Sequence, residues 1–147
     1  MDSTTKERRI RRGILIMSIG LLAISLTQKC YCTDSSTCGD SVIVFFLGAL
    51  SIMGITVGCF SGLCWLANPA LIMAWIFLKK KPQLSFYFSC ASLALSLLFF
   101  FLRSEWSFET GSCHEIDTFS AGYWLWVSSS LVTLAGSRIL SSVRKNK

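Results

Sequence analysis

The longest uncharged stretch of the chain runs from Ser41 to Leu78, and it constrains every fold that this sequence can adopt. It contains 38 residues without a charged side chain, and three lysines follow it directly, Lys79, Lys80 and Lys81. As one straight α-helix it would be roughly 57 Å long, nearly twice the ~30 Å hydrocarbon core of a bilayer. The stretch is also too apolar for the core of a soluble domain. It therefore predicts a membrane segment that contains a break.

The rest of the chain has the same block-like pattern. Of its 147 residues 52% are hydrophobic, and they come in long runs rather than at periodic positions. Runs of about 18 or more apolar residues are typical of membrane-spanning helices. The sequence predicts an all-α membrane protein, a four-transmembrane-helix bundle that forms one integral membrane domain over residues 1–147. The predicted spans are about 13–28, 41–62, 84–102 and 122–138, with external loops over 29–40 and 103–121.

The break is expected at the segment Trp65-Leu66-Ala67-Asn68-Pro69. Proline lacks an N–H and biases the preceding residue away from helical geometry, so one helix should end at Asn68 and another begin at Pro69. The ten residues that follow are too few to cross a bilayer. An additional short half-helix, about residues 69–80, is therefore predicted in the cytoplasmic leaflet, with Trp65, Asn68 and Pro69 at its re-entrant break. Asn68 is expected to be a structural cap, and a role as a ligand or gate is the alternative.

Charge decides the orientation of the predicted spans. Of the 14 lysines and arginines, four spans with a cytoplasmic N-terminus leave only Lys29 and Arg103 outside, and the external loops carry six of the eight acidic residues. Five spans would place eight basic residues outside. Because basic residues in short loops stay on the cytoplasmic side, four spans with both termini cytoplasmic are predicted. The basic residues flank apolar blocks, so the expected partner is the lipid bilayer and not nucleic acid.

The first predicted span follows a basic segment, residues 1–12, and can be an uncleaved signal anchor or a cleaved signal peptide. No small-residue cleavage site follows the apolar run, which favours the uncleaved anchor. Whether the span is removed remains open from the sequence.

Four of the seven cysteines fall in the predicted external loops: Cys30, Cys32, Cys38 and Cys113. An even number of cysteines on an oxidising side of the membrane is typical of disulfide bonds. Two connectivities remain open, Cys30–Cys38 with Cys32–Cys113, and Cys30–Cys113 with Cys32–Cys38. The other three, Cys59, Cys64 and Cys90, are expected in or near the membrane, where a free cysteine is a small apolar filler.

Two sets of small residues are expected to pack helices together. Gly54, Gly58 and Gly62 recur every four residues, which would place them on one helix face. Such faces let membrane helices approach closely, either inside the bundle or along a homo-oligomer seam. The next apolar block carries a serine stripe, Ser85, Ser89, Ser92 and Ser96, which is expected to be a packing seam; a polar conduit is the alternative.

Aromatic and basic residues near the ends of the blocks are expected to anchor the protein in lipid. Tryptophan and tyrosine concentrate at membrane–water interfaces, and lysines near the cytoplasmic face bind anionic head groups. The residues predicted to anchor the chain are Trp75, Lys79, Lys80, Lys81, Tyr123, Trp124 and Trp126.

Little in the sequence points to catalysis, so no catalytic residue, no metal site and no cofactor is predicted. Four-span disulfide-forming proteins and their vitamin K epoxide reductase counterparts work with a C-x-x-C pair beside a quinone, whereas Cys30 and Cys32 are spaced C-x-C. A quinone-linked thiol oxidoreductase is therefore a weaker alternative. His114 lies beside Cys113, Glu115 and Asp117, without a known ligand spacing. No ionisable residue lies in the middle of a predicted span, as coupled transport usually requires.

The Trp65-to-Pro69 motif, followed by an apolar run containing Trp75 and preceded by a glycine-rich segment, resembles a feature of small uncharacterised four-span bacterial inner-membrane proteins. The resemblance covers about residues 45–80 and implies a multi-pass protein of the bacterial inner membrane, without an activity. The expected function is non-catalytic: binding, or support of a membrane assembly, for example as an immunity-type protein. The alternative is an oligomeric conduit for small molecules or lipids.

Overall fold

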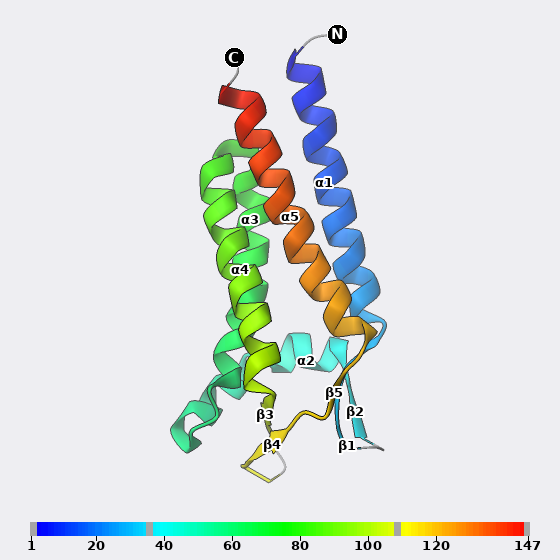
Figure 1. Cartoon of the computed structure of the whole chain (residues 1–147), viewed down its shortest axis with the longest axis vertical. Coiled ribbons are helices and arrows are strands. Elements are labelled where there is room, and N and C mark those ends of the chain that lie inside the picture. Colours follow the sequence, from blue (N-terminus) through cyan, green and yellow to red (C-terminus); the bar gives the residue numbers. More distant parts are fainter. Residues whose placement is uncertain (1–2, 35–36, 108–109, 146–147) are drawn as a thin grey trace.

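The computed structural model describes residues 3–34, 37–107 and 110–145, and it is mostly helical. Four long helical segments lie side by side along the molecule (Figure 1). They are α1 (Ser3–Leu26), the 3-10 helix η2 (Phe60–Leu66) continued by α3 (Ala67–Lys80), α4 (Pro82–Leu102) and α5 (Ala121–Lys145). Helix α5 packs between α1 and α4, and α3 packs on α4. Both termini and the α3–α4 turn lie at one end of this bundle (Figure 1).

The opposite end is built from short elements, and there the all-α prediction is wrong. Helix α2 (Ser41–Leu47) crosses the end of the bundle (Figure 1), and the 3-10 helix η1 (Leu50–Val57) follows it. Strands β1 (Lys29–Asp34), β2 (Thr37–Asp40) and β5 (Thr118–Phe119) form an antiparallel sheet in the order β2-β1-β5. Strands β3 (Ser104–Trp106) and β4 (Cys113–Glu115) form a separate pair. We call this region the strand end. Strands this short leave almost no alternation in the sequence by which to predict them.

The long uncharged stretch does break, but not where the sequence indicated. Helix α2 ends at Gly48, and η1 ends at Gly58, which has a left-handed φ of 87°. Glycine adopts this conformation without the steric penalty of a side chain. The single helix predicted over 41–62 is therefore wrong, because residues 41–57 form α2 and η1 at the strand end. The segment that runs along the bundle is Phe60–Lys80.

The separate half-helix predicted over 69–80 is also wrong. Those residues are the second part of the 21-residue segment Phe60–Lys80. At Asn68 and Pro69 the helix does not end: η2 passes directly into α3 between Leu66 and Ala67. Pro69 is the third residue of α3, in the first turn, where a missing N–H removes no α-helical hydrogen bond. The motif therefore marks a change of helix type and not a re-entrant break.

The glycines predicted to share one helix face do not share one. Gly54 lies in η1, where an added Cβ would come within 2.7 Å of the Trp106 ring. Gly62 lies in η2 and faces the backbone of Ser51 and Ile52. Gly58 lies between the two helices and ends the first one. A spacing of four does not align residues in 3-10 helices, which repeat every three residues. Gly54 and Gly62 do permit close packing, but between segments within this chain.

The serine stripe on α4 is a packing seam, as predicted. Ser85, Ser89, Ser92 and Ser96 are fully buried. The hydroxyl of Ser85 donates to the Ala74 carbonyl at 2.7 Å, which joins α4 to α3. The hydroxyls of Ser92 and Ser130 lie 2.9 Å apart and join α4 to α5.

Large apolar side chains, by contrast, lie on the outside of the bundle. Ile16 on α1 is 72% exposed and Phe101 on α4 is 77% exposed. Within the described residues, two segments are long and apolar enough to cross a membrane, Phe60–Lys80 and Pro82–Leu102. Helices α1 and α5 are of comparable length, with 24 and 25 residues.

Candidate functional site

A cavity of about 160 Å³ lies where the bundle meets the strand end. Helices α1 and α2, the η2–α3 segment, α4, α5 and strands β1 and β3 all contribute to its wall. Its apolar wall includes Leu22, Leu26, Val44, Phe45, Trp65 and Phe99. The indole of Trp65 donates to the Phe45 carbonyl at 2.8 Å, so it holds α2 against η2 and supports this wall. Trp65 thus has a structural role at the cavity, although the predicted re-entrant loop is absent.

The buried side-chain polar atoms of cavity-lining residues that lack a hydrogen-bond partner in the described structure include one acceptor and one donor. One is the side-chain carbonyl oxygen Oδ1 of Asn68, a residue that is only 7% exposed. The other is the indole nitrogen Nε1 of Trp126 on α5. Buried polar atoms in proteins are almost always hydrogen-bonded, so each such exception requires an explanation.

The strand side of the cavity carries a carboxyl group, that of Glu105 on β3. The buried Tyr31 hydroxyl on β1 is hydrogen-bonded to it. Burial raises the pKa of Glu105 above its ordinary value, and this hydrogen bond and the nearby His114 oppose the rise. Burial likewise raises the pKa of Tyr31. Glu105 is the single carboxylic acid among the described residues that line the cavity, and His114 lies opposite it on β4.

Cys30 also lines the cavity and is buried with a free thiol. Burial raises the pKa of this thiol to about 12, while a hydrogen bond with Ser41 opposes the rise. The reactive form of cysteine is the thiolate, so the Cys30 thiol is not a nucleophile at neutral pH.

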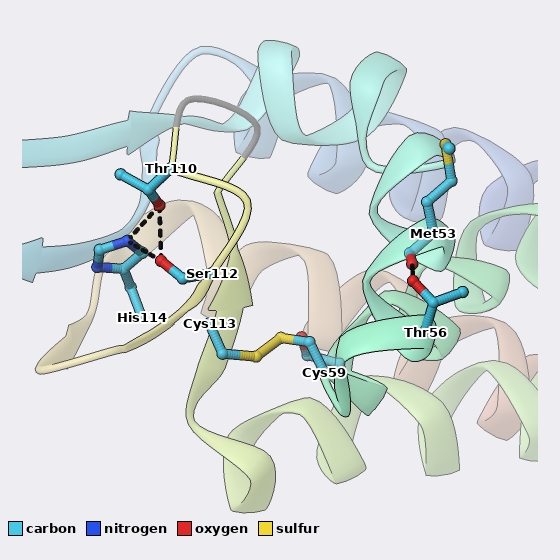
Figure 2. The surroundings of a disulfide bond; sticks show 8 residues. Met53, Thr56, Cys59, Thr110, Ser112, Cys113 and His114 are labelled. Atoms are coloured by element: carbon cyan, nitrogen blue, oxygen red, sulfur yellow. Dashed lines mark hydrogen bonds between the residues drawn. A yellow bond between two sulfur atoms is a disulfide. The ribbon is translucent and has the colours of Figure 1, made fainter.

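The disulfides lie at the strand end, and their connectivity corrects the prediction. Cys32 pairs with Cys38 across the β1–β2 hairpin, as in one of the two predicted connectivities. Cys113 pairs with Cys59, not with Cys30 or Cys32 (Figure 2). Cys59 was expected in or near the membrane as a free thiol. It instead lies between η1 and η2, because α2 and η1 fold across the strand end and bring it within a 5.9 Å Cα–Cα distance of β4.

His114 lies beside this disulfide on the exposed face of β4 (Figure 2). Its Nε2 atom is 2.9 Å from the Thr110 hydroxyl and 3.2 Å from the Ser112 hydroxyl. In residues 3–34, 37–107 and 110–145 no group of three histidine, cysteine, aspartate or glutamate side chains is placed to hold a metal ion.

Two of the predicted lipid anchors point into the protein. The Trp75 indole donates to the Ser18 hydroxyl at 2.9 Å and to the Thr133 hydroxyl at 3.1 Å, inside the bundle. Tyr123 is fully buried and donates to the Ser96 carbonyl at 2.8 Å. The interfacial role predicted for both is wrong, because each has a polar tip that binds a buried group on a neighbouring helix.

The remaining predicted anchors differ in their placement. Trp126 is half-buried and lines the cavity. Trp124 and the three lysines, Lys79, Lys80 and Lys81, are exposed, and their anchoring role stays a prediction.

The sequence reasoning missed Tyr31 and Glu105. They lie in the two predicted external loops, where no spacing relates them, and 74 positions separate them along the chain. Only the pairing of β1 and β3 with their neighbours brings them together at one cavity.

Comparisons with protein-family models, with curated proteins and with solved structures found no match to this chain.

Proposed function

We propose that this chain is an integral membrane protein that crosses the bilayer four times and acts by binding rather than by catalysis. The observation that carries the proposal is the reversed polarity of the bundle. Its interior contains fully buried hydroxyl groups such as Ser18, Ser92 and Thr133, and its outside carries large apolar side chains such as Ile16 and Phe101. In lipid the outer face needs no polar cover, and hydrogen bonds between helices contribute to their association.

Charge supports one orientation of the four segments. The α3–α4 turn with Lys79, Lys80 and Lys81 lies at the same end as both termini, which are rich in arginine and lysine (Figure 1). The strand end carries acidic residues, including Glu105, Glu115 and Asp117. The end that contains the termini is therefore proposed to be cytoplasmic, because basic residues stay on that side.

The disulfides support the same orientation. Both disulfides, Cys32–Cys38 and Cys59–Cys113, lie at the strand end. Disulfides form and persist outside the cytosol, so the strand end is proposed to face the periplasm of a bacterial inner membrane. A cavity with unpaired polar atoms at this end favours a binding role. A protein that binds a partner there to support an assembly, or an immunity-type protein that binds a toxin there, is a concrete form of this function.

Labelling of single introduced cysteines with a membrane-impermeant maleimide tests the proposal in whole cells. The three free cysteines, Cys30, Cys64 and Cys90, are first replaced by alanine or serine. Thr56→Cys, on the exposed face of η1, should react in intact cells whose outer membrane has been permeabilised. Lys80→Cys should react only after the inner membrane is opened.

A third position separates a membrane protein from a soluble one. Ile16 is 72% exposed on α1, so a cysteine there would react readily in a soluble protein. In a membrane the same position faces lipid, and Ile16→Cys should react neither before nor after the membrane is opened. Rapid labelling of Ile16→Cys would overturn membrane insertion, and labelling of Lys80→Cys in cells with an intact inner membrane would overturn the four-span topology.

A further inference from the structure

We propose that helix α2 lies in the periplasmic surface of the bilayer, with its exposed apolar face against lipid. The partner of this face is the boundary between the head groups and the acyl chains of the periplasmic leaflet. The inference rests on the membrane insertion proposed above. It assigns a lipid contact to an element that lies across the end of the bundle instead of crossing the membrane (Figure 1).

One side of α2 consists of exposed apolar side chains. The exposed residues of this helix are Val42, Ile43, Phe46 and Leu47, and Phe46 is 68% exposed. Positions i, i+1, i+4 and i+5 lie on the same side of an α-helix, because the helix repeats every 3.6 residues. Leu50, at the start of η1, extends the exposed surface. Contiguous apolar surface of this kind marks a contact with a protein or with a membrane.

Contacts on the other side of α2 attach it firmly to the bundle. The Trp65 indole donates to the Phe45 carbonyl at 2.8 Å. Gly48 lies so close to the same ring that an added Cβ would come within 2.5 Å of it. The backbone N–H of Ser41, a buried residue, donates to the Gln28 carbonyl at 3.2 Å. The exposed side of α2 is therefore a defined surface of the molecule.

The length of α4 places α2 at the edge of the hydrocarbon core. Helix α4 has 21 residues, so it is about 31 Å long and matches the ~30 Å core of a bilayer. A bilayer that covers α4 therefore ends near the last turn of this helix. In Figure 1, α2 lies at the level of that turn and runs across the bundle, whereas the β1–β2 hairpin extends farther out. This is the position of a helix that lies in the plane of the membrane interface.

The composition of α2 favours lipid over a protein partner. Residues 42–50 contain no polar side chain. Specific protein interfaces, by contrast, have a polar rim and about one hydrogen bond per 100–200 Å². The chain becomes charged directly before the helix, where Asp40 forms an exposed ion pair with Lys29. An apolar face with a charged pair at one end fits the boundary between lipid and water.

The apolar surface continues onto the segment that is proposed to cross the bilayer. Helix η1 packs against η2, and Met53 and Leu63 are exposed on these two helices. Farther along the segment Phe60–Lys80, Ile72 is exposed as well. No charged side chain occurs between Ser41 and Leu78. The lipid contact of α2 is therefore an extension of the contact proposed for the bundle.

The placement of α2 bears on the binding role, because this helix forms part of the cavity wall. Ile43, Val44, Phe45 and Leu47 all line the cavity. Ile43 and Leu47 are exposed as well, so lipid that covers them adjoins the cavity. A leaflet that holds α2 in place would therefore support this wall.

Nitroxide spin labels at single introduced cysteines test the proposal on the full chain in nanodiscs. The three free cysteines are first replaced as described above, and the label is attached to Phe46→Cys. Oxygen concentrates in lipid and a neutral nickel chelate in water, so the ratio of their effects on power saturation measures the depth of the label. The label at position 46 should respond more to oxygen than to nickel and should lie about 5–10 Å inside the head-group boundary.

Three further positions supply reference values. Ile16→Cys, on the exposed face of α1, should respond still more strongly to oxygen. Thr56→Cys should respond more to nickel, because it is exposed near the turn between η1 and η2, which lies farther from the bundle than α2 (Figure 1). Ile43→Cys gives an independent reading on α2 if the variant at position 46 does not fold, and it should agree with that position.

Two results would overturn the inference. Labels on α2 that respond more to nickel than to oxygen would show that the helix lies in water. Labels that neither reagent reaches would show that protein covers the helix, and dipolar broadening would identify that protein as a second copy. If either result is obtained while position 16 responds to oxygen, only the placement of α2 fails. A label at position 16 that responds mainly to nickel removes the proposed membrane insertion itself.

Discussion

The side-chain oxygens of Ser18 on α1 and Thr133 on α5 lie 2.7 Å apart, although 115 positions separate them in the chain. The Trp75 indole of α3 donates to both hydroxyls, so three helices meet at one buried polar cluster. Ser129 joins it, with its own hydroxyl donating to the Ser18 carbonyl at 2.9 Å. In a bilayer, where apolar side chains gain little by leaving lipid, such clusters help to determine which helices associate.

Replacement of Ser18 by alanine should therefore lower the free energy of unfolding by about 1 kcal/mol, since it removes the hydroxyl that links the three helices. Ser18→Leu should cost more, because the added volume has no space among fully buried neighbours. Thermal unfolding in a mild detergent measures both effects. Ser142→Ala, at an exposed position of α5, is the matched control and should change stability by less than about 0.5 kcal/mol. Equal losses at positions 18 and 142 would contradict the role of the cluster.

Gly122, at the start of α5, allows close contact between that helix and the strand end. A Cβ atom there would lie 2.6 Å from the Lys29 carbonyl oxygen and would also collide with the Ser41 hydroxyl. Backbone atoms cannot move aside as a side chain can, so Gly122→Ala should destabilise the protein by about 1–3 kcal/mol. Gly20→Ala in α1, where a Cβ meets nothing within 4 Å, should instead stabilise it by about 0.4–1 kcal/mol. The unfolding temperatures of the two variants should shift in opposite directions, and a shift in the same direction would count against the packing described.

The disulfide connectivity can be read directly from peptides. After alkylation without reduction, digestion should yield one peptide pair linked through Cys59 and Cys113, and Cys30 should carry the alkyl group. Unfolded, unreduced protein should contain three free thiols, and Cys113→Ser should raise the number to four because Cys59 loses its partner. Cys90→Ser is the control and should lower it to two. A linked Cys30–Cys113 peptide would show that the segment before η2 is placed differently.

Glu105 should make stability depend on pH. Burial raises its pKa in the folded protein above the ordinary value of 4.5. A carboxyl group with a raised pKa favours the folded state when protonated, so its contribution is complete below pH 4.5 and is lost as the pH rises through the folded pKa. Glu105→Gln keeps a hydrogen-bonding side chain but does not titrate. The stability of this variant relative to wild type should therefore increase from pH 4 towards pH 7.

The control for this effect is Glu115→Gln, on the neighbouring strand β4, where the carboxylate is exposed. Tyr31 and His114 lie beside Glu105, so the comparison should be repeated in a His114→Gln background to isolate the effect of the Glu105 carboxyl group. A difference between Glu105→Gln and wild type that stays constant with pH would show that the carboxyl group is not buried as described.

The sequence by itself determined the features that depend on local composition. Apolar blocks predict long helical segments, and α1, α4 and α5 contain most or all of the blocks assigned to them. The spacing of Ser85, Ser89, Ser92 and Ser96 placed four hydroxyls on one α-helical face, and that face is buried. Such signals are readable because helix periodicity and hydrophobicity act over neighbouring residues.

Only the tertiary structure decided where the uncharged stretch bends and what the bend brings together. An apolar run of 38 residues has no local feature that selects Gly48 and Gly58 over Asn68 as the points where helices end. That choice depends on contacts with distant residues: Trp106 against Gly54, and the bond from Cys59 to Cys113. Once α2 and η1 lie across the strand end, Asn68 and Trp126 both belong to the lining of one cavity. No spacing along the chain encodes such a meeting, because it depends on packing among elements that are far apart in the chain.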